Sequence, residues 1–461
     1  MLTYDMNERG RLPMYEYLYI CIRDDIVSGR LSSNEKLPSK RQLAANLGIS
    51  LITVQNAYEQ LLVEGYIFSK ERQGYFVSEI VTGISAPVAA DSKPQTSDND
   101  SGLVMDFTSS HIIYDNFPYS MWARLMRQTL LDEQGAFLKS PNHQGVRELR
   151  EAIAEHLREF RGLSVNPENI IVGAGTEYLY SMIVQLIGRS GMIAVEDPGH
   201  LKVAQVYESC GVKVVHIPVD EHGMSAERLK DAQVMAVHLS PSHQFPTGSV
   251  MSASRRHSII SWAREHDRII IEDDYDSEFR FTGRPISTMA SLDQEHVIYM
   301  NTFSRTLSPS IRIAYMVLPG GLMVKYRQRL GFYSCTVSGM EQFTLARFIS
   351  GGYYGRHLNR MRNYYRNKRN IILEAINGSR LSQHVSIEEE DAGLHFLLRV
   401  NKEIDDEAYT ATLLEHGIRI TPVSKYCYRP QEKYNHRFII NYSAVDAEGI
   451  EEAFDTMAEI L

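Results

Sequence analysis

A polar loop between two apolar runs carries the residues best suited to bind an anion. Residues 301–312 read Asn-Thr-Phe-Ser-Arg-Thr-Leu-Ser-Pro-Ser-Ile-Arg, and the flanking runs have the composition of buried strands. The hydroxyl of Ser304 and the guanidinium groups of Arg305 and Arg312 can donate to a phosphate or a carboxylate. The pattern therefore predicts an anion site that two core strands hold in place.

A glycine-containing turn supplies a second set of donors. Gly175, Thr176 and Glu177 follow a short apolar run and precede a stretch whose apolar residues have helical spacing. The free N–H groups and the dipole at a helix N-terminus favour a bound phosphate. Such a turn often only reverses the chain. A phosphate needs several converging donors, however, so we expect the turn to lie beside Ser304 and Arg312.

An acidic segment follows another apolar run. Residues 272–276 read Glu-Asp-Asp-Tyr-Asp. At the carboxyl end of a parallel strand, these side chains would lie in the crevice where α/β proteins bind ligands. Asp273 and Tyr275 are two residues apart and would point to the same side. A metal site and a solvated acidic loop are the alternatives, but no histidine is near in the sequence, and we expect no bound metal.

A third polar segment, residues 240–248, also follows an apolar run. It reads Ser-Pro-Ser-His-Gln-Phe-Pro-Thr-Gly and has too many turn-forming residues to be core. Two roles are open for His243. It either lines the same crevice as the acidic segment or has only a structural role.

The elements that must position these residues alternate between strand and helix patterns. Apolar runs predict strands at 170–172, 192–195, 212–218, 234–239, 269–271, 297–300 and 313–318. Helical stretches separate several of them, so we expect an α/β domain with a mostly parallel central sheet over residues 104–320. Long helices and short strands follow, which predicts a smaller α+β domain over 321–461.

Residues 1–79 have a different pattern, that of a small, mainly helical domain. Ser39 and Ser50 can cap two short helices that Gly48 separates, which is the arrangement of a helix-turn-helix. Two short apolar runs within residues 66–77 flank a polar turn. A two-stranded wing therefore follows the second helix.

This N-terminal stretch resembles the winged helix-turn-helix of the GntR family. The matching residues are Leu37-Pro38-Ser39, Arg41, Leu43-Ala44, Leu47-Gly48, Ser50, Thr53-Val54, Ala57-Tyr58, Leu61, Glu64-Gly65-Tyr66 and Gly74-Tyr75-Phe76-Val77. The resemblance implies binding to a double-stranded DNA operator. The residues expected at that interface are Lys36, Ser39, Lys40, Arg41, Ser50, Thr53, Gln55, Asn56, Tyr58, Arg72 and Gly74. Leu51 stands where the family often has arginine.

Charge and composition limit the alternatives for this domain and for the chain. Winged helices also serve as protein-docking modules, and residues 1–79 hold nine Lys/Arg against ten Asp/Glu, although the basic residues gather at the turn and the wing. The net charge of -9 argues against a protein that coats nucleic acid but allows one DNA-reading module. Residues 80–103 are rich in Ser, Asp and Pro, which predicts a flexible linker; a loop packed on the larger domain is the alternative.

The same composition bears on the compartment. Cys21, Cys210, Cys335 and Cys427 lie far apart without a Cys-x-x-Cys motif, which predicts reduced thiols and a cytoplasmic location. No window approaches 18 consecutive apolar residues, and the first residues include acids without an apolar segment. We therefore expect neither a transmembrane span nor a signal peptide, and no membrane partner.

The whole chain apart from the linker resembles the MocR subfamily, in which a GntR-type winged helix is fused to a fold-type I aminotransferase-like domain. The matches are Pro-Ser-His-Gln-Phe-Pro-Thr-Gly at 241–248, Glu-Asp-Asp-Tyr-Asp-Ser-Glu-Phe at 272–279, Thr-Phe-Ser at 302–304, and Leu-Ser-Pro-Ser-Ile-Arg-Ile at 307–313. The resemblance implies a dimeric regulator that senses pyridoxal phosphate (PLP) or PLP with an amino compound. It places Asp273 at the pyridine nitrogen and Tyr275 at the ring hydroxyl. Gly175, Thr176, Ser304 and Arg312 would hold the phosphate.

Three positions depart from the family pattern. Arg305 stands where the family has the lysine that bonds the cofactor, and a guanidinium is not a nucleophile toward an aldehyde. His200 stands where a tyrosine usually stacks on the cofactor ring. The arginine that often binds a carboxylate near the C-terminus is replaced by Ile439, and Arg437 is either its substitute or part of a surface salt bridge.

These departures favour sensing over catalysis. The first interpretation is a transcription regulator that binds a PLP-like ligand non-covalently, and His200, Arg305 and Glu177 are then cofactor-site residues too. The second is a regulator with an empty or repurposed pocket. The third is a PLP-dependent aminotransferase fused to a DNA-binding domain, which Arg305 disfavours because transamination needs a lysine amine.

Overall fold

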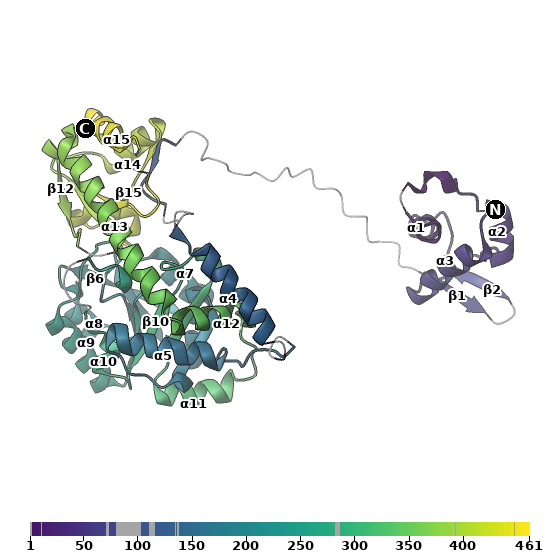
Figure 1. Ribbon diagram of the computed structural model, residues 1–461, viewed down its shortest axis with the longest axis horizontal. Helices are drawn as coiled ribbons and strands as arrows, with labels where there is room; N and C mark the ends of the chain where they lie inside the picture. Colours follow the sequence, from purple (N-terminus) through teal and green to yellow (C-terminus); the bar gives the residue numbers. More distant parts are fainter. Residues whose placement is uncertain are drawn as a thin grey trace. The chain divides into compact units, whose positions relative to one another are not determined.

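The computed structural model describes residues 2–10, 12–70, 73–79, 103–109, 116–133, 135, 138–281, 286–391, 393–446 and 448–461. The expected linker at 80–103 lies outside the described residues except for residue 103. The chain forms two compact units, residues 1–98 and 99–461, and each has its own core (Figure 1). No helix in the described ranges is both long enough and apolar enough to cross a membrane.

The N-terminal unit is a winged helix-turn-helix. Its elements are α1 Met14–Val27, α2 Lys40–Leu47, α3 Leu51–Val63, β1 Ile67–Lys70 and β2 Gly74–Val77. The strands pair antiparallel, and Ile67 faces Val77 across the pair. The apolar faces of the three helices close one core with the inner side of this wing.

Capping side chains fix where α2 and α3 begin. The Ser39 hydroxyl accepts from the Gln42 backbone N–H at 3.2 Å, and the Gln42 side chain reaches back to the Ser39 N–H at 3.3 Å. Gly48 ends α2 in the left-handed conformation, with a φ of 63°. The Ser50 hydroxyl then accepts from the Thr53 N–H at 3.1 Å. The expected helix-turn-helix is therefore built by reciprocal caps around a glycine turn.

The larger unit is organised around an eight-stranded sheet with the order β4-β11-β10-β9-β8-β5-β6-β7. The strands are β4 Ile170–Ala174, β5 Met192–Asp197, β6 Lys213–Asp220, β7 Gly223–Met224, β8 Ala236–Leu239, β9 Ile269–Asp273, β10 Val297–Thr302 and β11 Ile313–Val317. Strands β10, β9, β8, β5 and β6 run parallel to one another. Only β11 and β7 run antiparallel to their neighbours, so the mostly parallel sheet is confirmed.

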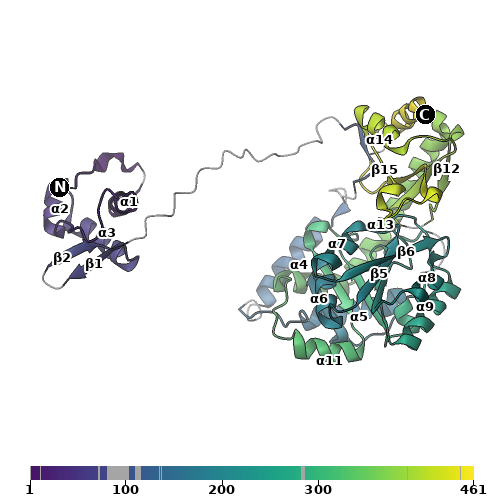
Figure 2. The same ribbon diagram turned by 180° about the vertical axis from the view of Figure 1, so that it is seen from behind.

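Helices cover both faces of this sheet. They are α4 Tyr119–Asp132, α5 Arg147–Arg161, α6 Thr176–Ile187, α7 Leu201–Ser209, α8 Ala226–Asp231, α9 Ala253–His266, α10 Met289–Leu292, α11 Gly320–Arg329 and α12 Gly339–Ser350. Alternate strand residues face opposite sides. Thus Val172 packs with the layer that contains α5, α9 and α12, and Ile171 packs with α6, α7 and α11. Figure 2 shows the α6 side.

The C-terminal part forms a second core around a four-stranded antiparallel sheet. Its elements are α13 Tyr353–Gly378, β12 Val385–Glu388, β13 His395–Val400, α14 Asp406–Glu415, β14 Ile418–Arg419, β15 Thr421–Pro422, β16 Arg437–Asn441 and α15 Ile450–Ile460. The order of that sheet is β12-β13-β16-β15. Strand β3, Met105–Asp106, pairs with β14, and Phe107 stacks on Phe454 at 5.6 Å. The first residues after the linker therefore pack with the C-terminal subdomain, a contact that the expected boundary at residue 104 did not anticipate.

Candidate ligand cavity and nucleic-acid interface

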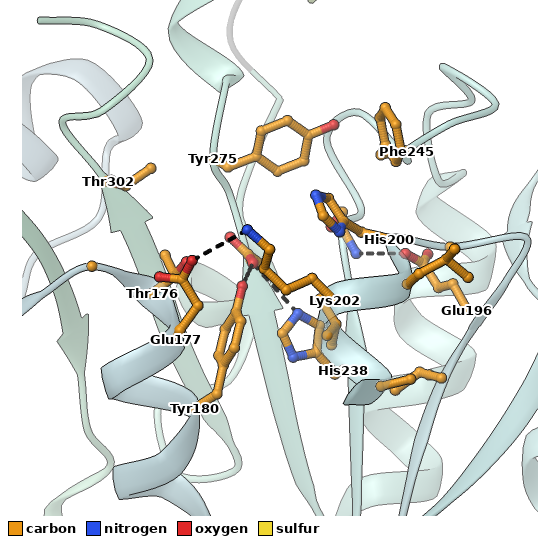
Figure 3. A pocket seen from close by; sticks show the side chains of 18 of the residues that line it. Thr176, Glu177, Tyr180, Glu196, His200, Lys202, His238, Phe245, Tyr275 and Thr302 are labelled. Carbon is orange, nitrogen blue, oxygen red and sulfur yellow. Dashed lines mark hydrogen bonds and ion pairs between the residues drawn. The ribbon is translucent and has the colours of Figure 1, made fainter. Parts of the chain in front are cut away.

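A cavity of about 290 Å³ lies at the carboxyl ends of the parallel strands (Figure 3). Nine of the ten residues expected at a cofactor site line it: Gly175, Thr176, Glu177, His200, Asp273, Tyr275, Ser304, Arg305 and Arg312. They come from the last residue of β9, from the segments that follow β4, β5, β9 and β10, and from the residue before β11. Because these strand ends share one edge of the sheet, segments far apart in the sequence meet there.

One end of the cavity gathers anion-binding groups. Thr176 begins α6, so its turn presents helix N-terminal N–H groups. Gly175 has a φ of +92°, and a Cβ there would lie 2.4 Å from Nη2 of Arg312. Only glycine allows this close approach. The Ser304 hydroxyl lies on the adjoining loop, where it accepts from the Thr302 hydroxyl at 3.0 Å.

The cavity wall also has a carboxylate with a free oxygen. Asp273 ends β9, and its Oδ2 accepts from the Tyr180 hydroxyl at 2.5 Å and lies 3.4 Å from Nε2 of His238. Its Oδ1 is buried and has no hydrogen-bond partner among the described residues. Buried polar atoms are nearly always paired in folded proteins. This atom is therefore suited to accept an N–H from a ligand such as a protonated pyridine.

Two aromatic rings of the cavity wall are held in their neutral forms by burial. Burial raises the pKa of Tyr275 well above its usual value, Asp276 adds to this, and Arg305 opposes it. The Tyr275 hydroxyl donates to the His243 carbonyl at 3.2 Å. Burial and the nearby Lys202 ammonium lower the pKa of His200. At neutral pH the cavity thus presents a phenol and an uncharged imidazole.

Arg305 is a cation on the cavity wall, at the position where the resemblance leads us to expect a lysine. It is half-buried, and no hydrogen bond or ion pair joins its guanidinium to any described residue. Burial lowers the pKa of His200 and of His395, and the charge of Arg305 adds to this; for Tyr275, Arg305 lowers the pKa against the larger effect of burial. An unpaired guanidinium on a cavity wall favours a ligand with a carboxylate or a second anionic group.

Several lining residues were not anticipated from the sequence. Tyr180 lies one turn into α6 on the face of Thr176, and His238 is a polar residue within the apolar run of β8; both contact Asp273. Lys202 follows His200 and pairs with Glu177 across 3.6 Å. Glu196 is the second-last residue of β5, and burial raises the pKa of its carboxyl to about 8. Of these residues, only His238 could have been singled out from the sequence, because it is a polar residue within an apolar run.

His243 and Arg437 are placed elsewhere. Nδ1 of His243 lies 2.9 Å from Asp276, and a Cβ on Gly393 would come within 2.0 Å of the His243 ring. This buried histidine packs under the Tyr275 segment and is not among the lining residues. Arg437 in β16 makes two hydrogen bonds to Glu388, at 2.7 and 3.1 Å. A ligand carboxylate at Arg437 would have to displace Glu388.

The winged unit presents a polar and partly basic surface. Lys36, Arg41, Gln55 and Asn56 are exposed, and Lys40 lies half-buried over the Tyr75 ring at 5.3 Å. Ser39, Ser50 and Thr53 form the caps of α2 and α3, and Gly74 begins the second strand of the wing at a φ of +109°. Arg72 lies outside the described residues.

Tyr58 is a correction to the expected DNA interface. Its side chain has no exposed surface, because it packs in the core of the winged unit. Its hydroxyl donates to the Pro38 carbonyl at 2.9 Å. The tyrosine therefore ties α3 to the segment that leads into α2, and it has no surface to offer to DNA.

Comparisons with known proteins agree with this arrangement. The family described as bacterial regulatory proteins, gntR family, matches residues 14–77, and aminotransferase class I and II matches residues 104–457. The uncharacterized HTH-type transcriptional regulator YdeL of Bacillus subtilis is 39% identical over 94% of each chain. The probable rhizopine catabolism regulatory protein MocR of Rhizobium meliloti is 31% identical over 99% of this chain and 95% of its own. The pyridoxine biosynthesis regulator PdxR of Corynebacterium glutamicum is 30% identical over 88% and 87%.

Solved structures share the fold of the larger unit. The kynurenine aminotransferase of Pyrococcus horikoshii superposes with a TM-score of 0.69 at 24% identity, over 78% of this chain and 91% of its own. The α-aminoadipate aminotransferase LysN of Thermus thermophilus gives 0.67 at 22% identity, over 78% and 92%. At such identities the likeness speaks for the fold alone. With its winged helix-turn-helix followed by a fold-type I aminotransferase domain, the chain belongs to the MocR subfamily of GntR-type regulators.

Proposed function

We propose that this protein is a DNA-binding transcriptional regulator whose aminotransferase-like domain senses PLP, or PLP with an amino compound, without a covalent lysine. The observation that supports it most is the make-up of the cavity. It keeps an anion-binding end and a free acceptor at Asp273, while position 305 is arginine. The relative PdxR is named for regulating pyridoxine biosynthesis, which agrees with a vitamin B6 ligand.

The residues present suit a pyridoxal phosphate. Asp273 would accept from the ring nitrogen, and Tyr275 would meet the ring hydroxyl. Gly175, Thr176, Ser304 and Arg312 would hold the phosphate, with Arg312 already packed against Gly175. When bound, the cofactor supplies an aldehyde and an electron-withdrawing ring. The neutral His200 imidazole would lie where aminotransferases stack a larger ring.

Position 305 lacks the amine that transamination requires. A guanidinium stays protonated at any working pH, so Arg305 can neither attack an aldehyde nor accept a proton from a bound amino acid. Its unpaired guanidinium can instead bind the carboxylate of an amino compound. We therefore propose a sensor that has no transaminase activity. An aminotransferase fused to a DNA-binding domain and a regulator with a repurposed pocket are the alternatives.

A titration of the full chain with PLP, followed by visible absorbance, tests the ligand. We expect saturable binding and no adduct after borohydride treatment and peptide mass spectrometry. Lys202 is the one lysine among the described lining residues, so it is the peptide to search first. A lysine adduct would refute non-covalent binding, and no binding at all would favour the repurposed pocket.

Binding to the DNA upstream of its own gene tests the regulator role. We expect a specific complex whose affinity falls as salt rises, because lysine and arginine contacts to phosphates release counterions. The absence of any specific site would contradict this role. Measured turnover of an amino acid with a keto acid would instead support the fused aminotransferase.

A further inference from the structure

The anion-binding end of the cavity already contains an anion. Glu177, the second residue of α6, pairs with Arg312 at 2.9 Å through Oε2 and with Lys202 at 3.6 Å through Oε1. Figure 3 shows Lys202 reaching from the start of α7 across the cavity toward this carboxylate. Two cations from different segments therefore meet on one carboxylate at the place where a phosphate would bind.

Glu177 is charged at neutral pH. Burial acts to raise its pKa, but its own backbone N–H, the Arg312 guanidinium and the Lys202 ammonium together hold it below the ordinary value. A carboxylate in the first turn of a helix also gains from the helix dipole. The side chain thus has the same partners that a ligand phosphate would need.

Charge balance shows what this carboxylate does to the site. Arg312 and Lys202 bring two positive charges, and Glu177 removes one. A phosphate ester carries close to two negative charges at neutral pH. With the carboxylate in place, the net positive charge of these side chains is smaller than the negative charge of a phosphate. Without the carboxylate, the two cations would balance the charge of the phosphate.

We propose that Glu177 acts as a built-in competitor for the phosphate subsite, and that a phosphorylated ligand binds by drawing Arg312 and Lys202 away from it. This inference rests on the proposed function, because it concerns the same cavity. It makes Glu177 and Lys202 the residues that set how strongly the site responds to the phosphate of a ligand. Lys202 then serves as a phosphate contact, in addition to the donors that the sequence indicated.

These side chains are partly open to solvent, and their place on the cavity wall is what distinguishes them from ion pairs elsewhere on the surface. Glu177 and Lys202 line the cavity, and Arg312 is held against Gly175 by a contact that excludes any side chain there. A pair that only stabilised the fold would respond equally to ligands with and without phosphate. The proposed competitor responds only to the phosphate.

The test compares PLP with pyridoxal, which has the same ring but no phosphate. Dissociation constants are measured by absorbance titration of the full chain for the wild type, Glu177→Gln, Lys202→Met and the charge-keeping control Lys202→Arg. We expect Glu177→Gln to tighten PLP binding about tenfold and Lys202→Met to weaken it about tenfold, because each changes one charge near the phosphate. Lys202→Arg should stay near the wild type, and pyridoxal should change little throughout.

Three results would overturn the inference. The first is weaker or unchanged PLP binding in Glu177→Gln, which would mean that the carboxylate orients Arg312 and does not compete. The second is an equal change for pyridoxal, which would indicate a general disturbance of the cavity. The third is the lack of binding of either compound by every variant, which would overturn the proposed function and this inference with it. Circular dichroism of each variant checks that the fold is kept.

Discussion

At the scale of single residues, the identity of position 305 separates two chemistries that the rest of the cavity would allow equally. Asp273 keeps a free oxygen, and the turn at Gly175 keeps its close approach to Arg312. An arginine at 305 adds charge but no nucleophile. In the proposed sensor, the remaining residues would therefore act by binding and orienting a ligand.

Restoring an amine at this position tests whether the cavity is otherwise intact. With PLP, Arg305→Lys should give a lysine adduct that borohydride fixes and mass spectrometry assigns to residue 305. Arg305→Gln is the matched control and should give none. If Arg305→Lys also gives none, the pocket is unable to place the cofactor, and the repurposed-pocket alternative gains.

Glu196 should make stability depend on pH. Burial raises the pKa of its carboxyl to about 8, from an unfolded value near 4.5. The stability that the buried acid form contributes is complete below pH 4.5 and is lost as pH rises through about 8. Glu196→Gln keeps the shape without the charge. Between pH 6 and 9, we expect the wild type to lose ~2 kcal/mol more unfolding free energy than this variant, measured by denaturant unfolding. If the unfolding free energies of the wild type and Glu196→Gln changed equally with pH, the raised pKa of Glu196 would be contradicted.

At the scale of elements, the winged unit shows how short signals fix helix starts. Ser39 and Ser50 each accept a backbone N–H at the start of a helix, and Gly48 sits between them in the left-handed conformation. These contacts are local, so they follow from residues three positions apart. The surface that α3 presents depends on which of its residues the core does not bury.

Loss of the second cap should loosen α3. Ser50→Ala removes the acceptor for the Thr53 N–H, which should cost about 1 kcal/mol. Hydrogen exchange of the α3 amides in the full chain should then speed up about fivefold. Ser50→Asp, which can still cap, should exchange near the wild-type rate. Equal exchange in Ser50→Ala would mean that tertiary packing alone holds this helix.

The start of α3 should read thymine methyl groups. Leu51 is 43% exposed and Ile52 is 70% exposed, beside the exposed amides of Gln55 and Asn56. Apolar side chains in the major groove contact the thymine methyl. Replacing thymine by uracil in a bound operator should weaken binding about fourfold per lost contact. The variant with both Leu51→Ala and Ile52→Ala should lose this sensitivity; a retained sensitivity would assign the contact to other residues.

At the scale of the whole molecule, the proposed DNA reading and the proposed ligand binding would belong to two units with separate cores. Ligand binding in one unit must affect DNA binding by the other if the protein is a sensor. We expect the chain to do this as a homodimer, with a second copy of itself as the partner. Phe332 is 78% exposed and stacks on Tyr333 at 4.5 Å, which leaves an apolar pair on the larger unit. Such a pair gains stability when another surface covers it.

Sedimentation velocity tests the homodimer. One chain has a mass of 52.6 kDa, so we expect a species of twice that mass. Phe332→Glu should raise the dissociation constant at least about tenfold, because a carboxylate would be buried at the interface. Leu414→Glu, at an exposed site of α14, is the control and should leave the mass unchanged. A monomer in the wild type would contradict the dimer.

Much of the architecture was determined by the sequence alone. Local patterns fixed the capped helices of the winged unit and the strand edge at which polar segments meet, because these depend on periodicity and on residues a few positions apart. The loop at 301–312 and the turn at 175–177 were expected together and do lie on one cavity.

Only the tertiary structure decided which side chains share that cavity and with what partners. Tyr58 and His243 looked suited to function by their types and neighbours, but both are core residues. The proposal that Glu177 competes with a ligand phosphate depends on its ion pairs with Arg312 and Lys202, which only the tertiary structure shows. The physical reason is that burial and charge pairing join residues tens to hundreds of positions apart. No local pattern in the sequence records those contacts.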